Sequence, residues 1–148
     1  MQQAIEKAGV LIEALPYIRS YQGRIIVVKL GGSVMDQPEA ERELLRDVVF
    51  MHTVGMQPVI VHGGGKEISK AMDEAGLEPV FVQGLRYTDE RTLAIAENVL
   101  CGRINRRLVE TIENFGVEAI GLTSLTSCVL FADRMYLDGP DGRRVDIG

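Results

Sequence analysis

Two short apolar runs that each end in a glycine cluster constrain the fold of this chain more than any other feature. The first, residues 25–28, is followed by Lys29 and then by Gly31 and Gly32. The second, VIVHGGGK at residues 59–66, runs directly into three glycines and a lysine. Continuous β-branched runs suit strands that are buried on both faces of a parallel sheet, so we expect one such strand at each place.

Helix signals separate the two runs and continue after the second. Pro38, Glu39 and Glu41 mark the start of a helix that Gly55 ends, and a further helix is expected over residues 66–76. Strands that alternate with helices through short links predict an α/β fold with a sheet that is parallel at its centre.

The second half of the chain adds three expectations. Residues 78–82 and 117–122 are further strand candidates. Thr88 is expected to cap a long helix that bends at Gly102. The tail predicts a hairpin whose turn is DGPDG, residues 138–142.

The N-terminal segment has the pattern of a separate helix. Four apolar residues share one face at helical spacing: Leu11, Ala14, Leu15 and Ile18. Pro16 predicts a kink or a second short helix. Two interpretations remain open for residues 1–22, a helix packed on its own core and an arm that buries its face on another subunit.

Composition narrows the class of protein. The 148 residues are 46% hydrophobic and 25% charged, as in an ordinary soluble globular protein. The net charge of −5 argues against a general binder of nucleic acid or anionic membranes. Cys101 and Cys128 lack metal or redox spacing and are interpreted as buried structural thiols. Without a secretory signal or a membrane-length apolar run, a cytoplasmic location is expected.

The glycine loops match neither common nucleotide motif. A P-loop would need a glycine where Ile60 stands and Ser or Thr where Glu67 follows Lys66. A dinucleotide loop would need a glycine in place of Ile68. The carboxyl ends of parallel strands meet at one crevice, where glycine amides and a helix N-terminus bind anions. We therefore expect an anion site of another kind.

Three side chains are candidates for that site, each with an ordinary alternative. Lys29 ends an apolar strand and indicates an anionic partner, unless it only extends to solvent. Arg86 suits a bidentate clamp on a carboxylate, or is a surface loop charge. His62 is an acid or ligand candidate, although a histidine that opens a glycine loop more often fixes loop geometry.

The chemistry that these residues suit is phosphoryl transfer. The chain shows no Ser-His-Asp or Cys-His order and no zinc ligand set. Phosphoryl transfer relies on positioning and charge stabilisation rather than on a protein nucleophile. A carboxylate acceptor would need no base, because a Glu-like group with a pKa of about 4.3 is already ionised at neutral pH.

The segment EALPYIRSYQG, residues 13–23, resembles the N-terminal helix of arginine-sensitive acetylglutamate kinases, and four further segments together resemble the N-terminal half of this family of amino-acid kinases in arginine biosynthesis. They are VVKLGGS, VIVHGGGKEIS, GLRYTDERT and ENVLCGRINRRLVETI, in the family's order from about Ile25 to Gly121. The resemblance implies a three-layer α/β/α sandwich with a mainly parallel central sheet. It also implies phosphorylation of the side-chain carboxylate of N-acetyl-L-glutamate by ATP, which gives an acyl phosphate.

The resemblance further implies roles for six residues. The catalytic Lys29 would stabilise the transferring phosphoryl group, Gly31 and Gly32 would bind the phosphate, and the substrate would be held by Gly64, Gly65 and Arg86, with Arg86 on its α-carboxylate. The implied cofactor is ATP with Mg, and the metal would be held mainly by the nucleotide phosphates, with no protein metal ligand.

The same resemblance implies a domain organisation and partners. Residues 1–22 would be a helical arm and residues 23–148 the amino-acid-binding lobe, with the C-terminal nucleotide-binding lobe absent, so that this chain alone is expected to be poorly active. A homodimer through the long helix around Asn105 is implied, as are a hexamer through the N-terminal helix and inhibition by arginine. No nucleic-acid or membrane partner is expected.

Two other functions remain as alternatives. In the first, the chain is the kinase-like regulatory domain of an acetylglutamate synthase. The intact Lys29 and the HGGG segment argue against this alternative. In the second, the chain is a non-catalytic assembly domain, and only its short length supports this alternative.

Overall fold

The computed structural model describes residues 1–126, 131–138 and 144–148. Cys128 and residues 139–142 of the expected hairpin turn lie outside these ranges. The elements, in chain order, are α1 (Gln2–Tyr21), β1 (Ile25–Leu30), α2 (Gly32–Met35), α3 (Pro38–Thr53), β2 (Gln57–His62), α4 (Gly65–Glu74), β3 (Phe81–Val82), β4 (Leu85–Arg86), α5 (Glu90–Glu97), the π-helix η1 (Asn98–Asn105), α6 (Arg106–Glu113), β5 (Tyr136–Asp138) and β6 (Arg144–Asp146).

The two expected strands pair in parallel, which confirms the centre of the predicted α/β fold. Their register runs from Ile25 opposite Gln57 to Leu30 opposite His62. The connection between them is helical, and α3 begins at Pro38 as the sequence indicates. The chain leaves that helix through Gly55, whose φ of 91° lies in the left-handed region that favours glycine.

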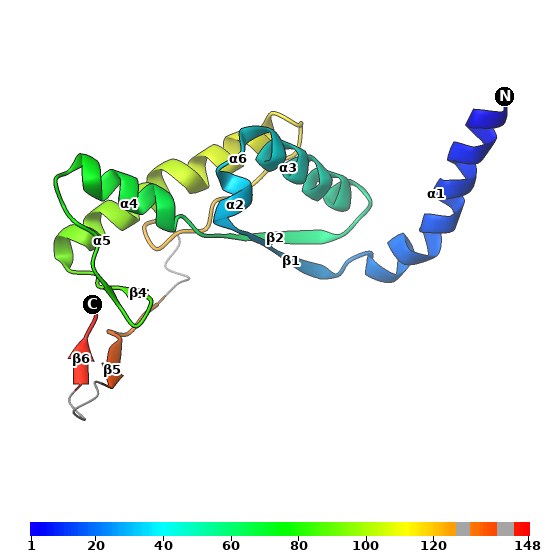
Figure 1. Ribbon diagram of the computed structural model, residues 1–148. Helices are drawn as coiled ribbons and strands as arrows, with labels where there is room; N and C mark the ends of the chain where they lie inside the picture. The colour runs from blue at the N-terminus through cyan, green and yellow to red at the C-terminus, as the bar shows by residue number, and fades with distance from the viewer. Residues whose placement is uncertain (127–130, 139–143) are drawn as a thin grey trace.

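The core lies between this sheet and the helices on one of its faces. Figure 1 shows α2, α3, α4 and α6 on the same side of β1 and β2. The largest fully buried side chains come from one strand, two helices and the π-helix: Leu30, Leu45, Met72, Val99 and Ile104. These side chains belong to one core cluster, so the carboxyl end of β1 and the helix α4 both lie on the core.

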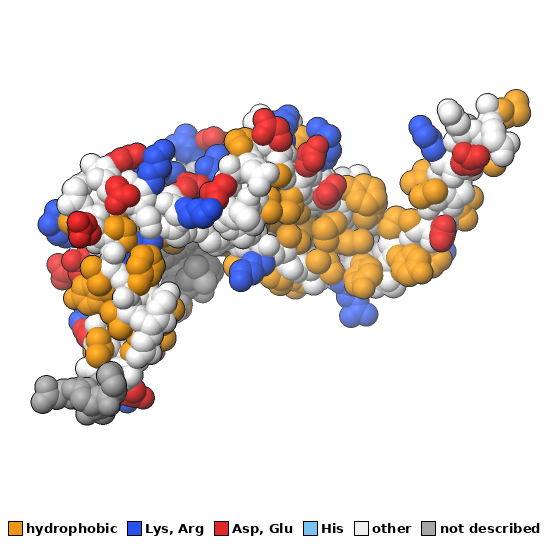
Figure 2. All heavy atoms as spheres, viewed as in Figure 1, with side chains coloured by type: hydrophobic (Ala, Val, Ile, Leu, Met, Phe, Trp, Pro, Cys, Tyr) orange, Lys and Arg blue, Asp and Glu red, His pale blue; other side chains and the backbone are white. Residues whose placement is uncertain are grey.

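The opposite face of the sheet is open, contrary to the expectation of burial on both faces. Ile25 and Val27 are 67% and 64% exposed, and Val59 and Val61 on the paired strand are also exposed. The register places all four on one face, and no element among the described residues covers them. Figure 2 shows hydrophobic side chains gathered from this region to the arm. The described residues therefore supply helices to one face only.

The strand candidate at residues 78–82 is shorter than expected. Only Phe81 and Val82 are in a strand, and they pair antiparallel with β4. Gln83 and Gly84 both have positive φ, 50° and 82°, which is the geometry of a tight two-residue hairpin turn. The turn begins directly after Val82, so the strand ends there.

The candidate at residues 117–122 is wrong, because this segment has no strand pairing. It lies instead beside the long helix, where an added Cβ on Gly121 would lie 3.4 Å from Val109 Cγ2. The expected C-terminal hairpin is confirmed by the antiparallel pair β5–β6. Ile147, just after it, is buried and accepts a hydrogen bond from the Thr88 N–H at 2.8 Å.

The expected long helix is a continuous run of α5, η1 and α6. Gly102, the expected bend, lies within the π-helical part. The cap is Asp89 rather than Thr88, since the Asp89 side chain accepts a hydrogen bond from the Thr92 N–H at 2.8 Å. Thr88 is one residue too early and uses its hydroxyl on the carbonyl of Arg86.

The N-terminal helix α1 extends away from the rest of the chain (Figure 1). It runs through Pro16 as one helix rather than as two. Its apolar residues, among them Leu11 and Leu15, are exposed, so they do not pack on the core of their own chain. No helix in the described part of the chain, α1 included, combines the length and the apolar character needed to cross a bilayer.

Candidate functional site

The two glycine loops lie side by side at the carboxyl edge of the sheet. Leu30 and His62, the last residues of β1 and β2, are direct neighbours in the parallel register. The Gly63 N–H donates to the Leu30 carbonyl at 3.3 Å, so the second loop is bonded to the end of the first strand. The sheet topology therefore brings both loops to one place.

The first loop leaves its amides open. The Gly31 carbonyl accepts hydrogen bonds from the N–H groups of Val34 and Met35, at 3.2 and 3.3 Å, which start α2. The N–H groups of Gly31 and Gly32 bond to no other described residue. A Cβ at either glycine would meet nothing within 4 Å, so the space in front of this backbone is free.

Lys29 lies on the open face of the sheet, opposite Val61 in the register. Its side chain is exposed and makes no hydrogen bond or ion pair with any described residue. The structure places it at the same end of the sheet as the loops but brings it into contact with neither Arg86 nor Gly65.

The second loop is packed from behind by the π-helix. A Cβ on Gly64 would lie 2.6 Å from Ile104 Cδ1 and 2.7 Å from Leu100 Cδ2. The absence of a side chain at Gly64 thus lets the chain approach η1, which is a packing reason for this glycine. Gly65 has open space around it and begins α4, a ten-residue helix.

Arg86 is joined to the second loop. Its Nη2 donates to the Gly65 carbonyl at 3.0 Å and to Ser69 Oγ at 2.8 Å, and its Nη1 donates to Met72 Sδ at 3.1 Å. The guanidinium also lies over the ring of Phe81, 4.9 Å from its centroid. Two of its five N–H groups make no hydrogen bond within the described residues.

A groove of about 500 Å³ opens beside this arginine. It is lined by Gly65, Lys66, Ser69, Lys70, Asp73, Phe81 and Arg86. Three of these side chains, Lys66, Lys70 and Arg86, are cationic and one, Asp73, is anionic, so the net positive charge of the lining suits an anionic ligand.

Two further contacts fix the loops. His62 Nδ1 lies 3.0 Å from the Gly63 carbonyl, which agrees with its interpretation as a residue that fixes loop geometry. Lys66, in the first turn of α4, forms an ion pair with Asp36 at the end of α2, so one contact spans both loops.

The structure thus brings together some, but not all, of the six expected site residues. Arg86 is hydrogen-bonded to Gly65, and Gly64 precedes Gly65 in the same loop. Gly31 and Gly32 are their neighbours through the bond between Gly63 and Leu30, whereas Lys29 stands apart on the sheet.

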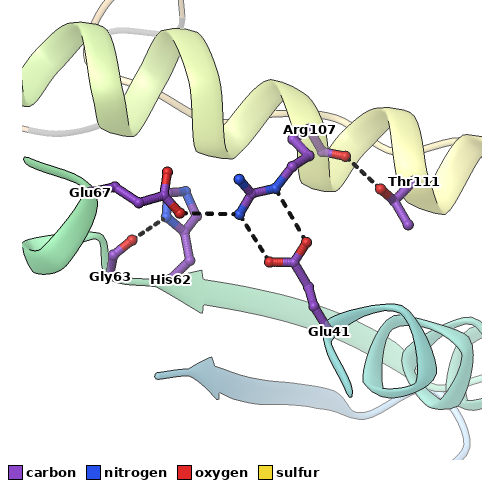
Figure 3. Close-up of polar contacts among 6 residues, drawn as sticks. All are labelled: Glu41, His62, Gly63, Glu67, Arg107 and Thr111. Atoms are coloured by element: carbon purple, nitrogen blue, oxygen red, sulfur yellow. Dashed lines mark hydrogen bonds and ion pairs between the residues drawn. The ribbon is translucent and has the colours of Figure 1, made fainter. Parts of the chain in front are cut away.

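A cluster that the sequence analysis missed lies behind the second loop (Figure 3). Arg107 on α6 binds Glu41 on α3 with two bonds, Nε to Oε1 at 3.2 Å and Nη2 to Oε2 at 3.0 Å. Its Nη2 also lies 3.3 Å from Glu67 Oε1 on α4. One sequence signal was available, because Glu41 stands in helical register with the buried Leu45 and Val48, on an otherwise apolar stripe.

Among the described residues, Arg107 of this cluster and Asp89 at the start of α5 have a perturbed pKa. Burial lowers the pKa of Arg107, but hydrogen bonds and charge from Glu41 and Glu67 outweigh it, so the net pKa is raised. The hydrogen bond from the Thr92 N–H lowers the pKa of Asp89. Within the described ranges, no three His, Cys, Asp or Glu residues are grouped so that they would hold a metal ion.

Comparison with known proteins connects this geometry to a family. Residues 24–147 match the sequence profile of the Amino acid kinase family. The acetylglutamate kinase of Heliobacterium modesticaldum is 42% identical over 152 residues, which cover 100% of this chain and 52% of that protein. That of Thermoanaerobacter pseudethanolicus is 46% identical, over 93% of this chain and 46% of its own length. The chain therefore spans about half the length of these relatives.

Solved structures share the fold. N-acetylglutamate synthase from Neisseria gonorrhoeae, complexed with coenzyme A and N-acetyl-glutamate, aligns with a TM-score of 0.65 and 25% identity over 76% of this chain and 26% of that one. A protein of Streptococcus mutans UA159 aligns with a TM-score of 0.60 and 32% identity, over 68% of this chain and 40% of that one.

Proposed function

Because the chain belongs to the amino acid kinase family, we propose that it is the amino-acid-binding lobe of an acetylglutamate kinase. The reaction would transfer the γ-phosphoryl group of ATP to the side-chain carboxylate of N-acetyl-L-glutamate. The observation that carries the proposal is the junction of the two glycine loops, since it sets two groups of free amides on one edge of the sheet. An edge of this kind can hold the phosphoryl group and the substrate carboxylate, both anionic, close enough to react.

The proposed chemistry needs no base from the protein. A carboxylate oxygen bonds to the γ-phosphorus while the bond from that phosphorus to the bridging oxygen breaks, and the electron pair leaves with ADP. No proton moves, because the acceptor carboxylate is ionised at neutral pH. This agrees with a site built from amides and cations.

Each candidate residue has one task in this proposal. Lys29 stabilises the charge of the transferring phosphoryl group, and the amides of Gly31 and Gly32 bind its oxygens. The second loop, Gly64 and Gly65, holds the acetylglutamate, and Arg86 binds its α-carboxylate. The two unpaired N–H groups of Arg86 support this last role, since a bidentate carboxylate contact requires two donors.

The described residues offer no cage for a metal. The Mg²⁺ that accompanies ATP in this proposal is held mainly by the nucleotide phosphates, and no step is assigned to it. The proposal places the pocket for the nucleotide base in a second lobe, outside residues 23–148. It follows that this chain alone binds acetylglutamate weakly and turns over poorly.

The proposal extends to assembly, location and regulation. Residues 1–22 form an arm that joins subunits into a hexamer, and the long helix around Asn105 joins pairs of subunits. The exposed apolar residues of α1 support the first of these contacts. The protein works in the cytoplasm as an enzyme of arginine biosynthesis, with arginine as the inhibitor.

The experiment is isothermal titration calorimetry of the purified 148-residue chain with N-acetyl-L-glutamate and with ATP and Mg²⁺. Weak binding of acetylglutamate in the absence of nucleotide supports the proposal. A chain that binds neither compound, while remaining folded, is an assembly domain instead. Phosphorylation of acetylglutamate by the chain alone would contradict the assignment of the nucleotide to a second lobe.

The regulatory domain of an acetylglutamate synthase is the second candidate, favoured by the similarity to the synthase structure. The identity of 42–46% to acetylglutamate kinases weighs more strongly than 25% to the synthase. The gene sequence distinguishes the two candidates. A nucleotide-binding lobe encoded downstream would support the kinase, whereas an acetyltransferase domain would support the synthase.

A further inference from the structure

We propose that Arg107 is a positioning residue for the second glycine loop. Through Glu41 and Glu67 it fixes the first turn of α4, and thereby the direction in which the amides of Gly64 and Gly65 face the substrate. The part that concerns the substrate rests on the function proposed above, whereas the effect on the loop does not.

The anchor of this arrangement is the pair between Arg107 and Glu41. Glu41 is buried, and both of its carboxylate oxygens are bonded to the guanidinium. A buried carboxylate that loses its partner is strongly unfavourable, so the pair is not exchanged for water at low cost. The guanidinium of an arginine stays charged throughout the working range of pH, so the pair keeps its charges. Arg107 is therefore a fixed point on α6.

The link from this fixed point to the loop is Glu67. It is the third residue of α4, two positions after Gly65, and it receives one bond from Arg107 at 3.3 Å. The same turn opens with the bond from the Ile68 N–H to the Gly64 carbonyl at 2.9 Å. Any rotation of this turn changes the direction of the amides that precede it.

A second arginine holds the same turn from the other side. Arg86 binds the Gly65 carbonyl and Ser69 Oγ, which lie four residues apart on one face of α4. Glu67 lies midway between these positions, about 200° away around a helix of 3.6 residues per turn. The first turn of α4 is thus held between two guanidinium groups, one from β4 and one from α6.

The chain contains a matched control at the next position. Arg106 also pairs with a glutamate, Glu110 at 2.8 Å, but both are on α6 and exposed. An exposed pair of this kind contributes little to stability and touches neither α3 nor α4. Arg106→Met therefore removes the same type of side chain without affecting the loop.

The test compares Arg107→Met with Arg106→Met in the full 148-residue chain labelled with ¹⁵N-glycine. In Arg107→Met we expect the amide resonances of Gly64 and Gly65 to shift and the dissociation constant for N-acetyl-L-glutamate to rise about tenfold, the lower range for a lost supporting contact. In Arg106→Met the two amide resonances and the dissociation constant should stay at their wild-type values. Equal behaviour of the two variants in both measurements overturns the proposal, even if Arg107→Met is less stable.

Variants of Glu67 keep the proposal testable if Arg107→Met does not fold. Glu67→Met leaves the buried pair intact but removes the link, so it should reproduce the resonance shifts and the weaker binding. Glu67→Gln keeps an acceptor oxygen, so this variant should show the wild-type resonances and the wild-type affinity. Equal losses in the two variants would point to the charge of Glu67 rather than to positioning, and would overturn the proposal. If the wild type binds no acetylglutamate, the proposed function fails while the resonances still decide on positioning.

Discussion

An added Cβ on Gly64 would lie 2.6 Å from Cδ1 of Ile104, a side chain that is fully buried. The closest approach to the glycine triplet thus comes from the protein's own π-helix. Gly64 and Gly65 serve different purposes, because the first allows packing and the second leaves space open in front of the loop.

Gly64→Ala should be destabilising for this reason. The cost is argued from the steric contact with η1: we expect about 1–3 kcal/mol in the free energy of unfolding, as for overpacked cores. Urea unfolding measures it. Gly63→Ala is the control, because a Cβ there would meet nothing within 4 Å. Equal stability of the two variants would show that η1 moves aside freely.

Arg86→Met should weaken the binding of N-acetyl-L-glutamate about tenfold to a hundredfold, since a charged hydrogen bond of about 1.5–3 kcal/mol is lost. Calorimetry gives the dissociation constants. Lys70→Met is the matched control, a cation from the same groove that has no assigned contact with the substrate. An Arg86 variant with wild-type affinity removes this residue from the site.

The two faces of β1 should respond differently to truncation. Leu30→Ala should cost about 2–5 kcal/mol, because its side chain is fully buried. Val27→Ala should cost less than about 1 kcal/mol, since mainly the strand propensity of valine is lost. Unfolding midpoints test both. A Val27 variant as unstable as the Leu30 variant would mean that another chain covers this face in solution.

The cap at Asp89 predicts a pH dependence of stability. Its pKa is lowered in the folded state, chiefly by the Thr92 N–H, so its contribution is complete above the ordinary Asp pKa of about 3.9 and is lost as the pH falls through the lowered value. Asp89→Ala should therefore melt below wild type at neutral pH and converge with it in acid. Asp89→Asn, a good cap without a charge, should differ less from wild type at neutral pH. A constant difference between Asp89→Ala and wild type down to the acid limit would contradict this role.

Removal of residues 1–22 should reduce the size of the assembly, if the exposed face of α1 is buried between subunits. Multi-angle light scattering gives the mass of both forms. Replacement of Leu11 and Leu15 by serine should have the same effect without shortening the chain. An unchanged mass in both cases would refute the arm.

The sequence predicted those parts of the fold whose signals are local. Runs of β-branched residues and the proline, glutamates and glycine around α3 located the β1–α3–β2 unit, and with it both glycine loops. It did not show that Ile25 and Val27 face outward, because burial depends on what covers a strand. Residues 117–122 have no strand pairing, because pairing depends on which strand edge lies beside a segment, and a local pattern does not report that.

The same limit applies to the site. The position of Arg86 before the long helix makes it a candidate, but its bonds to Gly65 and Ser69 reach 21 and 17 positions back along the chain. The cluster around Arg107 joins residues 40 and 66 positions apart along the chain, which no spacing rule connects. Only the glutamate on the apolar stripe of α3 hinted at a buried partner.

The π-helix between α5 and α6 also sets the rotational phase of everything that follows it. Neighbouring residues on an α-helix differ by about 100°, which is why Arg106 faces solvent while Arg107 faces Glu41. Loss of one residue between Asn98 and Asn105 would bring Leu108 to the angular position of Arg107 and leave a buried carboxylate facing a hydrocarbon. The length of this stretch is therefore constrained as strictly as the identity of any side chain near the loops.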